Sequence, residues 1–258
     1  MILQFRKYHG TGNDFIILDN RDNNIQLSAE NINFLCHRSF GIGADGLILL
    51  TYVHGFDFGM IYYNADGNES TMCGNGGRCI VSFARELGII RNTARFLAID
   101  GPHNAKVESD NSISLQMKEV TEIVHFQNHS ILNTGSPHYV LWLENIKEID
   151  VVREGRSLRN QIEFQPGGIN VNFAERRNQQ LFVRTYERGV EDETLSCGTG
   201  VTAVAIAASE NNLGDFQYEI NTPGGTLWVS FHKNTSCSAN AVILRGPATF
   251  VFSGLITI

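Results

Sequence analysis

The chain has 258 residues, 42% of them hydrophobic and 18% charged, which is enough apolar material for one large domain or two domains of ordinary size. Its formal net charge is −7 at pH 7 and no basic stripe is visible, which excludes nucleic acid as a partner because binding it needs clustered cations. The sequence shows neither a signal peptide nor an apolar stretch long enough to cross a membrane, so we expect a cytoplasmic protein.

The predicted elements are mostly short strands. One helix is expected from an N-terminal cap at Ser28 to about His37, and two more directly after Cys73 and Cys197. Apolar or alternating runs predict strands at residues 15–18, 47–51, 58–63, 112–117, 139–143, 181–186, 226–231, 241–244 and 249–252. This mixture predicts an α+β fold.

The five cysteines do not form a recognisable framework. They are an odd number, they are scattered, and no C-x-x-C pair occurs, which argues against structural disulfides and against a zinc site. In a reducing compartment they are thiols, and the question is which of them react. Cys36, Cys79 and Cys237 are expected to be inert, because the first two belong to helical packing patterns and the third to a polar hairpin.

The chain contains an internal repeat, which is the first feature to look for in a sequence of this length. The motif at residues 72–76 (MCGNG) has an echo at residues 196–200 (SCGTG), and their cysteines are 124 positions apart (197 − 73). The same or nearly the same offset relates Phe58 to Phe182, Tyr62 to Tyr186, and residues 11–13 to residues 134–136. We infer two copies of one domain, with a boundary between about Gln116 and Ile123.

Each repeated cysteine precedes an amphipathic helix. Apolar residues at 80, 83, 84 and 87 have helical spacing after Cys73, and those at 201, 204, 205 and 208 repeat it after Cys197. Gly88 and Gly214 are expected to end these helices. The predicted architecture is two pseudo-symmetric domains, each a curled, mainly antiparallel, barrel-like sheet around a central helix, with the active site in the cleft between them.

A cysteine at a helix N-terminus faces unpaired backbone N–H groups and the positive end of the helix dipole, which favour thiolate. The adjacent glycines let backbone donors approach a carboxylate and counter its charge while a carbanion forms. One sulfur as thiolate then removes an α-proton and the other, as thiol, returns one to the opposite face. A single Cys-Gly at a helix start is more often a small packed residue, but two copies at matching positions favour catalysis.

Other motifs are weaker. Residues 41–46 (GIGADG) fit a dinucleotide-binding fingerprint, but a helix precedes them and a strand follows, which is the wrong order. The segment at residues 186–189 is either a surface turn or a source of a guanidinium for a carboxylate. His138 is either a structural histidine or a group that tunes a nearby thiol.

These motifs resemble those of diaminopimelate epimerases over essentially the full chain. The resemblance rests on residues 10–15 (GTGNDF), 41–45 (GIGAD), 64–67 (NADG), 72–79 (MCGNGGRC), 170–173 (NVNF), 187–189 (ERG) and 196–200 (SCGTG). It implies interconversion of LL- and meso-2,6-diaminopimelate without pyridoxal phosphate or metal, on the route to lysine and peptidoglycan. It also implies a homodimer, and a last strand that returns to the first domain, giving domains of residues 1–118 plus 248–258 and residues 119–247.

The resemblance assigns roles to individual residues. Cys197 would take the proton from the LL isomer and Cys73 would donate one, while His138 and Glu187 would tune the thiols. Backbone groups at Gly74, Asn75, Gly198 and Thr199 would hold the reacting carboxylate. The remaining substrate ligands would be Asn13, Asn64, Ser136, Asn170, Glu187 and Arg188.

Three departures from the family pattern affect the expected specificity. Ser136 stands where asparagine is common, Gly46 stands where some members carry glutamine, and the loop at residues 189–194 lacks a second glycine and is one residue longer. The alternatives are an epimerase or racemase of the same fold for another amino acid, which a substrate panel separates, and a redox-sensing thiol protein, which predicts no α-proton exchange. Isomerases of the phenazine-biosynthesis type share the fold but lack this cysteine pair.

Overall fold

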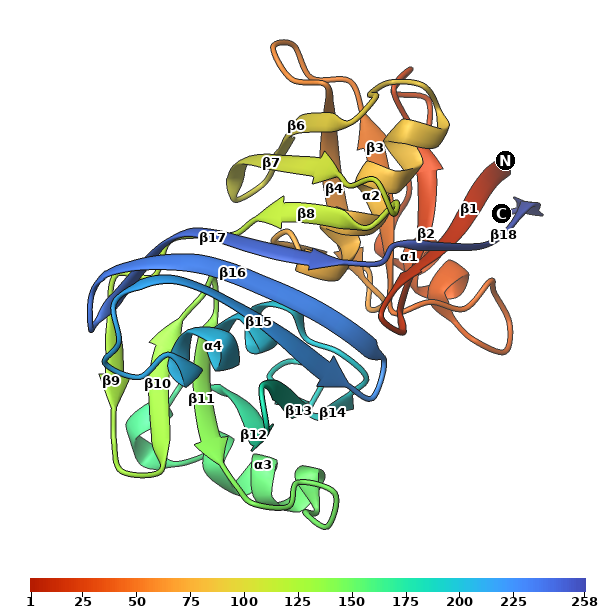
Figure 1. The fold of residues 1–258 in the computed structure, drawn as a ribbon. Coiled ribbons are helices and arrows are strands. Elements are labelled where there is room, and N and C mark those ends of the chain that lie inside the picture. Colours follow the sequence, from red (N-terminus) through yellow and green to blue (C-terminus); the bar gives the residue numbers. More distant parts are fainter. The chain divides into compact units, whose positions relative to one another are not determined.

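The computed structural model describes residues 1–258, which divide into two compact units. The first unit comprises residues 1–115 and 246–258, and the second comprises residues 116–245. Both units consist of strands around a central helix (Figure 1). No helix has the length and apolar character needed to span a membrane.

The first unit begins with a hairpin whose outer neighbour is the end of the chain. Strand β1 (Ile2–Gly10) pairs antiparallel with β2 (Asn13–Asp19) on one side and with β18 (Thr249–Thr257) on the other. Helix α1 (Ala29–Cys36) then connects β2 to its parallel neighbour β3 (Gly46–Thr51). The Ser28 side chain accepts from the Asn31 backbone N–H at 3.2 Å, which confirms the predicted start of this helix.

The second half of this unit carries its central helix. Strand β4 (Phe58–Asn64) pairs antiparallel with β3 and with the short β5 (Glu69–Ser70). Helix α2 (Gly74–Glu86) follows and crosses to β6 (Thr93–Ala98), which is parallel to β4. Strands β7 (Gly101–Val107) and β8 (Ile113–Gln116) continue the ladder antiparallel. Helix α2 packs on β1 to β4 and on β7, and Gly88 lies just beyond it at a φ of +71°, as expected for a C-terminal stop.

The second unit repeats this order of pairings. Strands β9 (Ile123–His125), β10 (His129–Asn133) and β11 (Pro137–Trp142) form an antiparallel ladder. Strand β11 is also parallel to β12 (Asn170–Arg177). The chain between these two strands forms helix α3 (Val151–Arg159) and a 3₁₀ turn at Ile162–Phe164. Strand β13 (Gln180–Glu187) pairs antiparallel with β12 and with the short β14 (Asp192–Thr194).

Its central helix, α4 (Gly198–Ala208), leads to β15 (Gly214–Thr222), which is parallel to β13. Strands β16 (Gly225–Thr235) and β17 (Ser238–Gly246) complete the antiparallel ladder. Strand for strand, β2 to β8 thus correspond to β11 to β17. The predicted α+β fold of two pseudo-symmetric domains is confirmed.

Helix α4 is buried nearly all round because its side chains are small and apolar, from Val201 to Ala208. The strands β10 to β13, β15 and β16 contact it on its different sides (Figure 1). A helix enclosed in this way holds its first residue in a defined place, and that first residue follows Cys197.

The prediction that Gly214 ends this helix is wrong. The helix ends at Ala208, and the Ser209 and Glu210 backbone N–H groups bond back to Ile206 and Ala207. Glu210 takes the left-handed conformation with a φ of +51°, whereas Gly214 is the first residue of β15. The apolar spacing gave the correct helix, but a non-glycine residue took the terminating conformation.

Candidate active site

Cys73 is the residue that caps the N-terminus of α2. Its φ of −93° is extended, so the helix starts directly after it, and the first intrahelical bond runs from the Gly77 N–H to the Cys73 carbonyl. The Cys73 thiol donates to Asn13 Oδ1 at 3.6 Å, and Asn75 Nδ2 donates to the same oxygen at 3.2 Å. Three predicted site residues, Cys73, Asn13 and Asn75, are therefore in contact.

The hairpin between β1 and β2 brings Asn13 to this helix. Thr11 and Gly12 both have positive φ, at 51° and 88°, so that the chain turns sharply before Asn13. A backbone of this kind accommodates glycine without strain, and Thr11 is held by its buried position.

Arg78 lies behind the same turn and was not predicted. It is fully buried, and it donates to the Gly74 carbonyl at 3.1 Å and to Asn75 Oδ1 at 2.9 Å. Its Nε donates to the Pro247 carbonyl at 3.3 Å. Burial lowers the pKa of this guanidinium, and no carboxylate pairs with it. Arg78 therefore orients the Asn75 side chain and contributes a positive charge near Cys73.

Two of the three cysteines that were expected to be inert, Cys36 and Cys79, are buried in surroundings that keep them protonated. Burial raises the pKa of Cys36 to about 12, and raises the pKa of the fully buried Cys79 further. Both remain protonated near neutral pH, and a protonated thiol is a poor nucleophile and a poor base. Cys237 is exposed in the turn between β16 and β17.

Cys197 caps α4 in the same way as Cys73 caps α2. It is buried, its φ is −114°, and the Val201 N–H bonds to its carbonyl at 3.0 Å. Its sulfur lies 3.5 Å from Thr199 Oγ1, which lies 3.4 Å from Ser136 Oγ. The Thr134 hydroxyl also donates to the Thr199 carbonyl, at 2.9 Å, so that the β10–β11 turn is attached to the start of α4.

His138 extends this chain of polar groups into the interior. Its Nε2 lies 3.0 Å from Ser136 Oγ, and its Nδ1 lies 3.1 Å from Asn172 Nδ2. Thr185 donates to Asn172 Oδ1, which leaves the Asn172 nitrogen facing the histidine. The His138 proton therefore resides on Nε2 and points to Ser136. Burial, reinforced by the charge of Arg188, lowers the pKa of His138 to about 3, so the ring is neutral at physiological pH.

Asn170 and Arg188 join the same cluster. Asn170 Nδ2 donates to Ser136 Oγ at 3.0 Å, and its Oδ1 accepts from the Arg188 backbone N–H at 2.9 Å. The Arg188 guanidinium donates to the Gly167 carbonyl at 3.3 Å. Glu187 lies beside them at the end of β13, where it accepts from Thr194 at 2.9 Å. In the second unit the structure thus connects Cys197, Thr199, Ser136, His138, Asn170 and Arg188.

Asn64 and Gly46 lie opposite each other on neighbouring strands of the first unit. Asn64 is the last residue of β4 and pairs with Gly46 of β3. Gly46 has no room for a larger residue, since a Cβ atom there would lie 2.6 Å from the Tyr62 ring. Tyr62 therefore occupies the space next to the backbone of Gly46.

Sequence reasoning missed the residues that support the site, chiefly Asn172, Thr185 and Arg78. The signal for Asn172 was present: successive side chains of a strand alternate, so Asn170 and Asn172 lie on one face of β12. No comparable signal existed for Arg78, because burial of an arginine in the second turn of a helix is not visible in the sequence.

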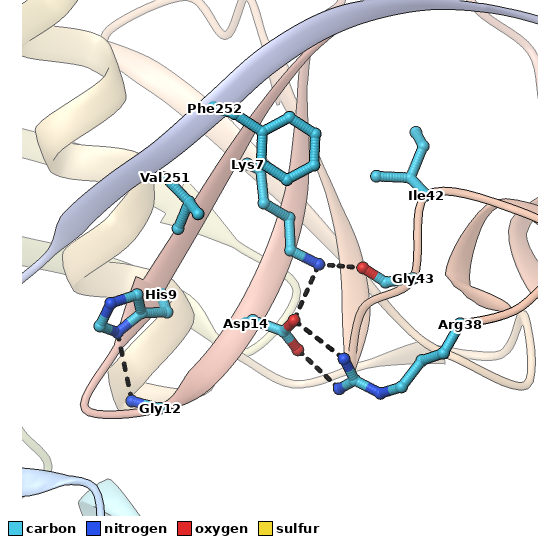
Figure 2. Close-up of a pocket in the computed structure, with 9 residues that line it drawn as sticks. All are labelled: Lys7, His9, Gly12, Asp14, Arg38, Ile42, Gly43, Val251 and Phe252. Atoms are coloured by element: carbon cyan, nitrogen blue, oxygen red, sulfur yellow. Dashed lines mark hydrogen bonds and ion pairs between the residues drawn. The ribbon is translucent and has the colours of Figure 1, made fainter.

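A further cavity lies in the first unit, with a volume of about 390 Å³ (Figure 2). Lys7, Asp14 and Arg38 line it together with Val251 and Phe252 of β18, and none of the predicted site residues does. No group of three or more His, Cys, Asp and Glu side chains is arranged to hold a metal ion.

The chain shares its fold with solved structures of low sequence identity. A phenazine biosynthesis protein of the PhzF family from Bacillus anthracis superposes with a TM-score of 0.79 over 100% of both chains, at 13% identity. A hydroxyproline epimerase from Agrobacterium vitis superposes with a TM-score of 0.72 over 99% of this chain and 92% of its own, at 13% identity.

Sequence comparison identifies the family. The profile described as diaminopimelate epimerase matches residues 5–123 and 130–251. A diaminopimelate epimerase of Flavobacterium psychrophilum is 50% identical over 97% of this chain and 98% of its own, and one of Aquifex aeolicus is 40% identical over 98% and 97%. The chain belongs to the diaminopimelate epimerase family, whose members are isomerases that act as amino-acid epimerases.

The buried neutral His138 gives a testable pH dependence. Its pKa is about 3 in the folded protein against 6.5 when unperturbed, so between these values the unfolded chain binds a proton that the folded chain does not. The free energy of unfolding should therefore fall as the pH is lowered from about 6.5 towards 3. Urea unfolding at pH 7, 6, 5 and 4 measures this loss of unfolding free energy. The part of it that is due to His138 should be absent in His138→Gln.

His232 provides the control for that measurement. It is half-buried, and the hydrogen bonds that its ring donates to Asp215 and to Asn234 raise its pKa, so any stability it contributes is present at low pH and lost as the pH rises. His232→Gln should leave the acid-side loss unchanged. An equal loss in His138→Gln and in the unmodified protein would show that the ring is not held neutral.

Proposed function

We propose that this chain interconverts LL- and meso-2,6-diaminopimelate by a two-base mechanism in which Cys73 and Cys197 act on opposite faces of one α-carbon. The observation that supports it best is that both copies of the repeated motif place a cysteine as the N-cap of a central helix. Inversion needs one group that removes a proton and another that returns one from the other side, and a pair of thiols can exchange these roles when the reaction runs in the opposite direction.

The helix starts supply the anion-binding groups. The first intrahelical bonds are made by the Gly77 and Val201 N–H groups, so the backbone N–H groups that precede them point out of the start of each helix. Such groups, with the helix dipole, stabilise a carboxylate and the negative charge that develops when the α-proton leaves. We assign the reacting carboxylate to Gly74, Asn75, Gly198 and Thr199.

The polarity of the hydrogen bonds supports different resting states of the two thiols. Cys73 donates to an amide oxygen, which favours the protonated thiol. Around Cys197 the direction is opposite: His138 and Asn170 both donate to Ser136, so the Ser136 hydroxyl hydrogen is available to Thr199 and the Thr199 hydrogen to the sulfur. This direction favours thiolate, so we assign Cys197 as the base for the LL isomer and Cys73 as the acid.

The remaining assignments concern the rest of the substrate. We propose that Asn13, Asn64, Ser136, Asn170, Glu187 and Arg188 bind it. Arg188 would pair with a carboxylate, because its guanidinium has only a carbonyl partner in this structure. Both acceptor positions of Ser136 are occupied, by His138 and Asn170, so a hydrogen bond to substrate would use the hydroxyl hydrogen that otherwise faces Thr199. Neutral His138 tunes Cys197 through hydrogen bonds and not through charge.

We also propose a cytoplasmic homodimer that functions in the synthesis of lysine and peptidoglycan precursors, without a cofactor. The exposed strand β18 supports a dimer, since Phe250, Val251, Phe252 and Leu255 are between 44% and 71% exposed. Apolar side chains gathered on one outer strand are typical of an interface between protomers. The cytoplasm supports the chemistry, because both thiols must stay reduced.

The test is incubation in D₂O with LL- or meso-diaminopimelate, followed by mass spectrometry and chiral separation. Deuterium should enter the α-carbon, and each isomer should yield the other. A panel of L-amino acids is the control for specificity. If another amino acid is inverted and diaminopimelate is not, that amino acid is the substrate. If deuterium enters the α-carbon of no substrate, the protein is not an epimerase and the redox-sensing alternative remains.

A further inference from the structure

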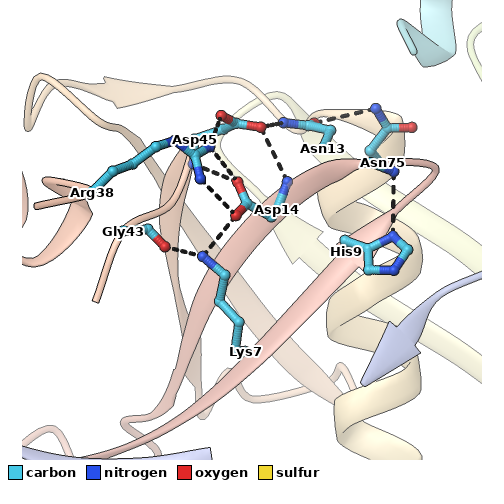
Figure 3. A network of polar contacts seen from close by, with 9 residues as sticks. Lys7, His9, Asn13, Asp14, Arg38, Gly43, Asp45 and Asn75 are labelled. Carbon is cyan, nitrogen blue, oxygen red and sulfur yellow. Dashed lines mark hydrogen bonds and ion pairs between the residues drawn. The ribbon is translucent and has the colours of Figure 1, made fainter. Parts of the chain in front are cut away.

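The side chain of Asn13 is held between two sets of partners (Figure 3). On one side its nitrogen donates to Asp45 Oδ2 at 2.7 Å. On the other side its oxygen accepts from Asn75 Nδ2 and from the Cys73 thiol, at 3.2 and 3.6 Å. Asp45 belongs to the GIGAD segment, to which the mechanism above assigns no role.

The chemistry of these partners determines which way round the amide lies. An ionised carboxylate only accepts hydrogen bonds, so Asp45 requires the nitrogen of Asn13 to face it. The oxygen is thereby turned to Cys73, where it can accept from a thiol but cannot donate to a thiolate. With the amide reversed, an N–H group would face the sulfur and favour the thiolate instead.

Asp45 is itself held firmly, although its side chain is 42% exposed. Its Oδ1 accepts from Arg38 Nη2 at 2.7 Å, and its Oδ2 also accepts from the Asp14 backbone N–H at 3.1 Å. Arg38 bonds both carboxylate oxygens of Asp14, at 2.9 and 3.2 Å, and Lys7 pairs with Asp14 at 2.8 Å (Figures 2 and 3). Although burial alone raises the pKa of Asp14, hydrogen bonds from Arg38 and Lys7 outweigh it and hold that pKa well below its usual range.

We propose that Asp45 is a positioning residue for the reaction: it fixes the Asn13 amide so that its oxygen faces Cys73 and keeps that sulfur a proton donor in the resting enzyme. Arg38, Asp14 and Lys7 form the ionic support that holds Asp45 in place. The inference rests on the proposed function for its catalytic meaning, but the link from Asp45 through Asn13 to Cys73 can be measured without turnover.

The charged and titratable groups of the first unit that surround Cys73 must be separated from this effect. Arg78 and Cys79 belong to its own helix, and Asp100, between β6 and β7, accepts from the Met72 N–H at 3.3 Å. The others are His9 and Lys7 on β1, Asp14 on β2, and Arg38 and Asp45 before β3. The substitution has to distinguish the orientation of one amide from the loss of one charge.

Asp45→Asn is the decisive variant, because it keeps the shape and removes the purely accepting group. The single amide oxygen that the variant carries at position 45 can satisfy Arg38 or Asn13 but not both, and Arg38 gives the stronger, charge-assisted bond. Of the two anchors of the Asn13 amide only Asn75 then remains, so the reversed orientation of the amide becomes accessible. The pH midpoint of Cys73 alkylation by iodoacetamide, read by peptide mass spectrometry in a Cys197→Ser background, should fall by about one pH unit, the size of one hydrogen bond to a charged group. Exposed Cys237 serves as an internal reference.

The same substitution in an Asn13→Ala background provides the control, as a double-mutant cycle. If Asp45 acts through the amide, Asp45→Asn should cause no further fall when Asn13 is absent. An equal fall in both backgrounds would mean that Asp45 acts by its charge alone, and an unchanged midpoint with Asn13 present would mean that it does not act on Cys73. Either result overturns the proposal.

A kinetic measurement separates this inference from the proposed function. With Cys197 intact, Asp45→Asn should move the bell-shaped pH profile of kcat/KM to lower pH, whereas a merely structural role would lower it at all pH values without moving it. A moved alkylation midpoint in a protein that does not epimerise diaminopimelate would refute the proposed function and leave the positioning role intact. A lowered profile that does not move would refute the positioning role and leave the function intact.

Discussion

Replacing either Cys73 or Cys197 with serine is expected to lower the rate of epimerisation by about a thousandfold or more, because a hydroxyl is far too weak an acid or base for the step. The fold should be retained. Both cysteines are N-cap residues that make no capping hydrogen bond with their side chains, and serine is among the preferred residues at that position. The free energy of unfolding, from urea titrations, should therefore be unchanged or slightly higher.

The two variants should also differ from each other in D₂O. Cys73→Ser keeps the base for the LL isomer, so LL-diaminopimelate should exchange its α-proton with retention of configuration while the meso isomer does not exchange at its reacting carbon. Cys197→Ser should show the converse. Exchange of both isomers by one single variant would mean that one group reaches both faces, and full epimerase activity in either variant would exclude the two-thiol mechanism.

The repeat in the sequence predicted most of the fold, because residues that match between the two copies occupy equivalent packing positions in the two domains. Phe58 and Tyr62 lie in β4 and their counterparts Phe182 and Tyr186 lie in β13, at the same position relative to the central helix. Helix α3 was missed, since its sequence (VVREGRSLR) is strongly polar and only Val151 and Gly155 are buried. Its place depends on tertiary contact: a Cβ on Gly155 would lie 2.4 Å from the Tyr186 Cβ.

The candidate site was predictable where a backbone motif determines the chemistry and not where side chains meet across strands. Glycine after cysteine at a helix start predicted the N-cap positions of Cys73 and Cys197. The contacts of Asp45 with Asn13 and of His138 with Ser136 depend on how the chain turns between strands, and the sequence contains no sign of them. His138 illustrates the limit: the alternatives of structural residue and thiol tuner are not exclusive, because a buried, neutral ring donates to Ser136.

The second large effect is expected at Gly200, the fifth residue of the second cysteine motif. A Cβ atom there would lie 2.3 Å from Asn172 Oδ1, a distance that requires movement. Asn172 cannot move at low cost, because it is fully buried and bonded to Thr185, His138 and the Tyr139 carbonyl. Gly200→Ala should therefore destabilise the protein by about 1–3 kcal/mol, as overpacking does.

The activity of Gly200→Ala should fall by roughly a hundredfold, since the displaced Asn172 and His138 position the groups beside Cys197. The matched control is Gly76→Ala at the corresponding place in the first motif. There a Cβ would meet only the ends of Ile48, Met60 and Phe15 side chains, at 3.2 to 3.5 Å, and alanine gains about 1 kcal/mol of helix propensity over glycine. Urea titrations and kcat/KM should therefore separate the two variants clearly. If both variants lost stability and activity equally, the two glycines would serve the same backbone requirement, and the contact with Asn172 would not be what makes Gly200 necessary.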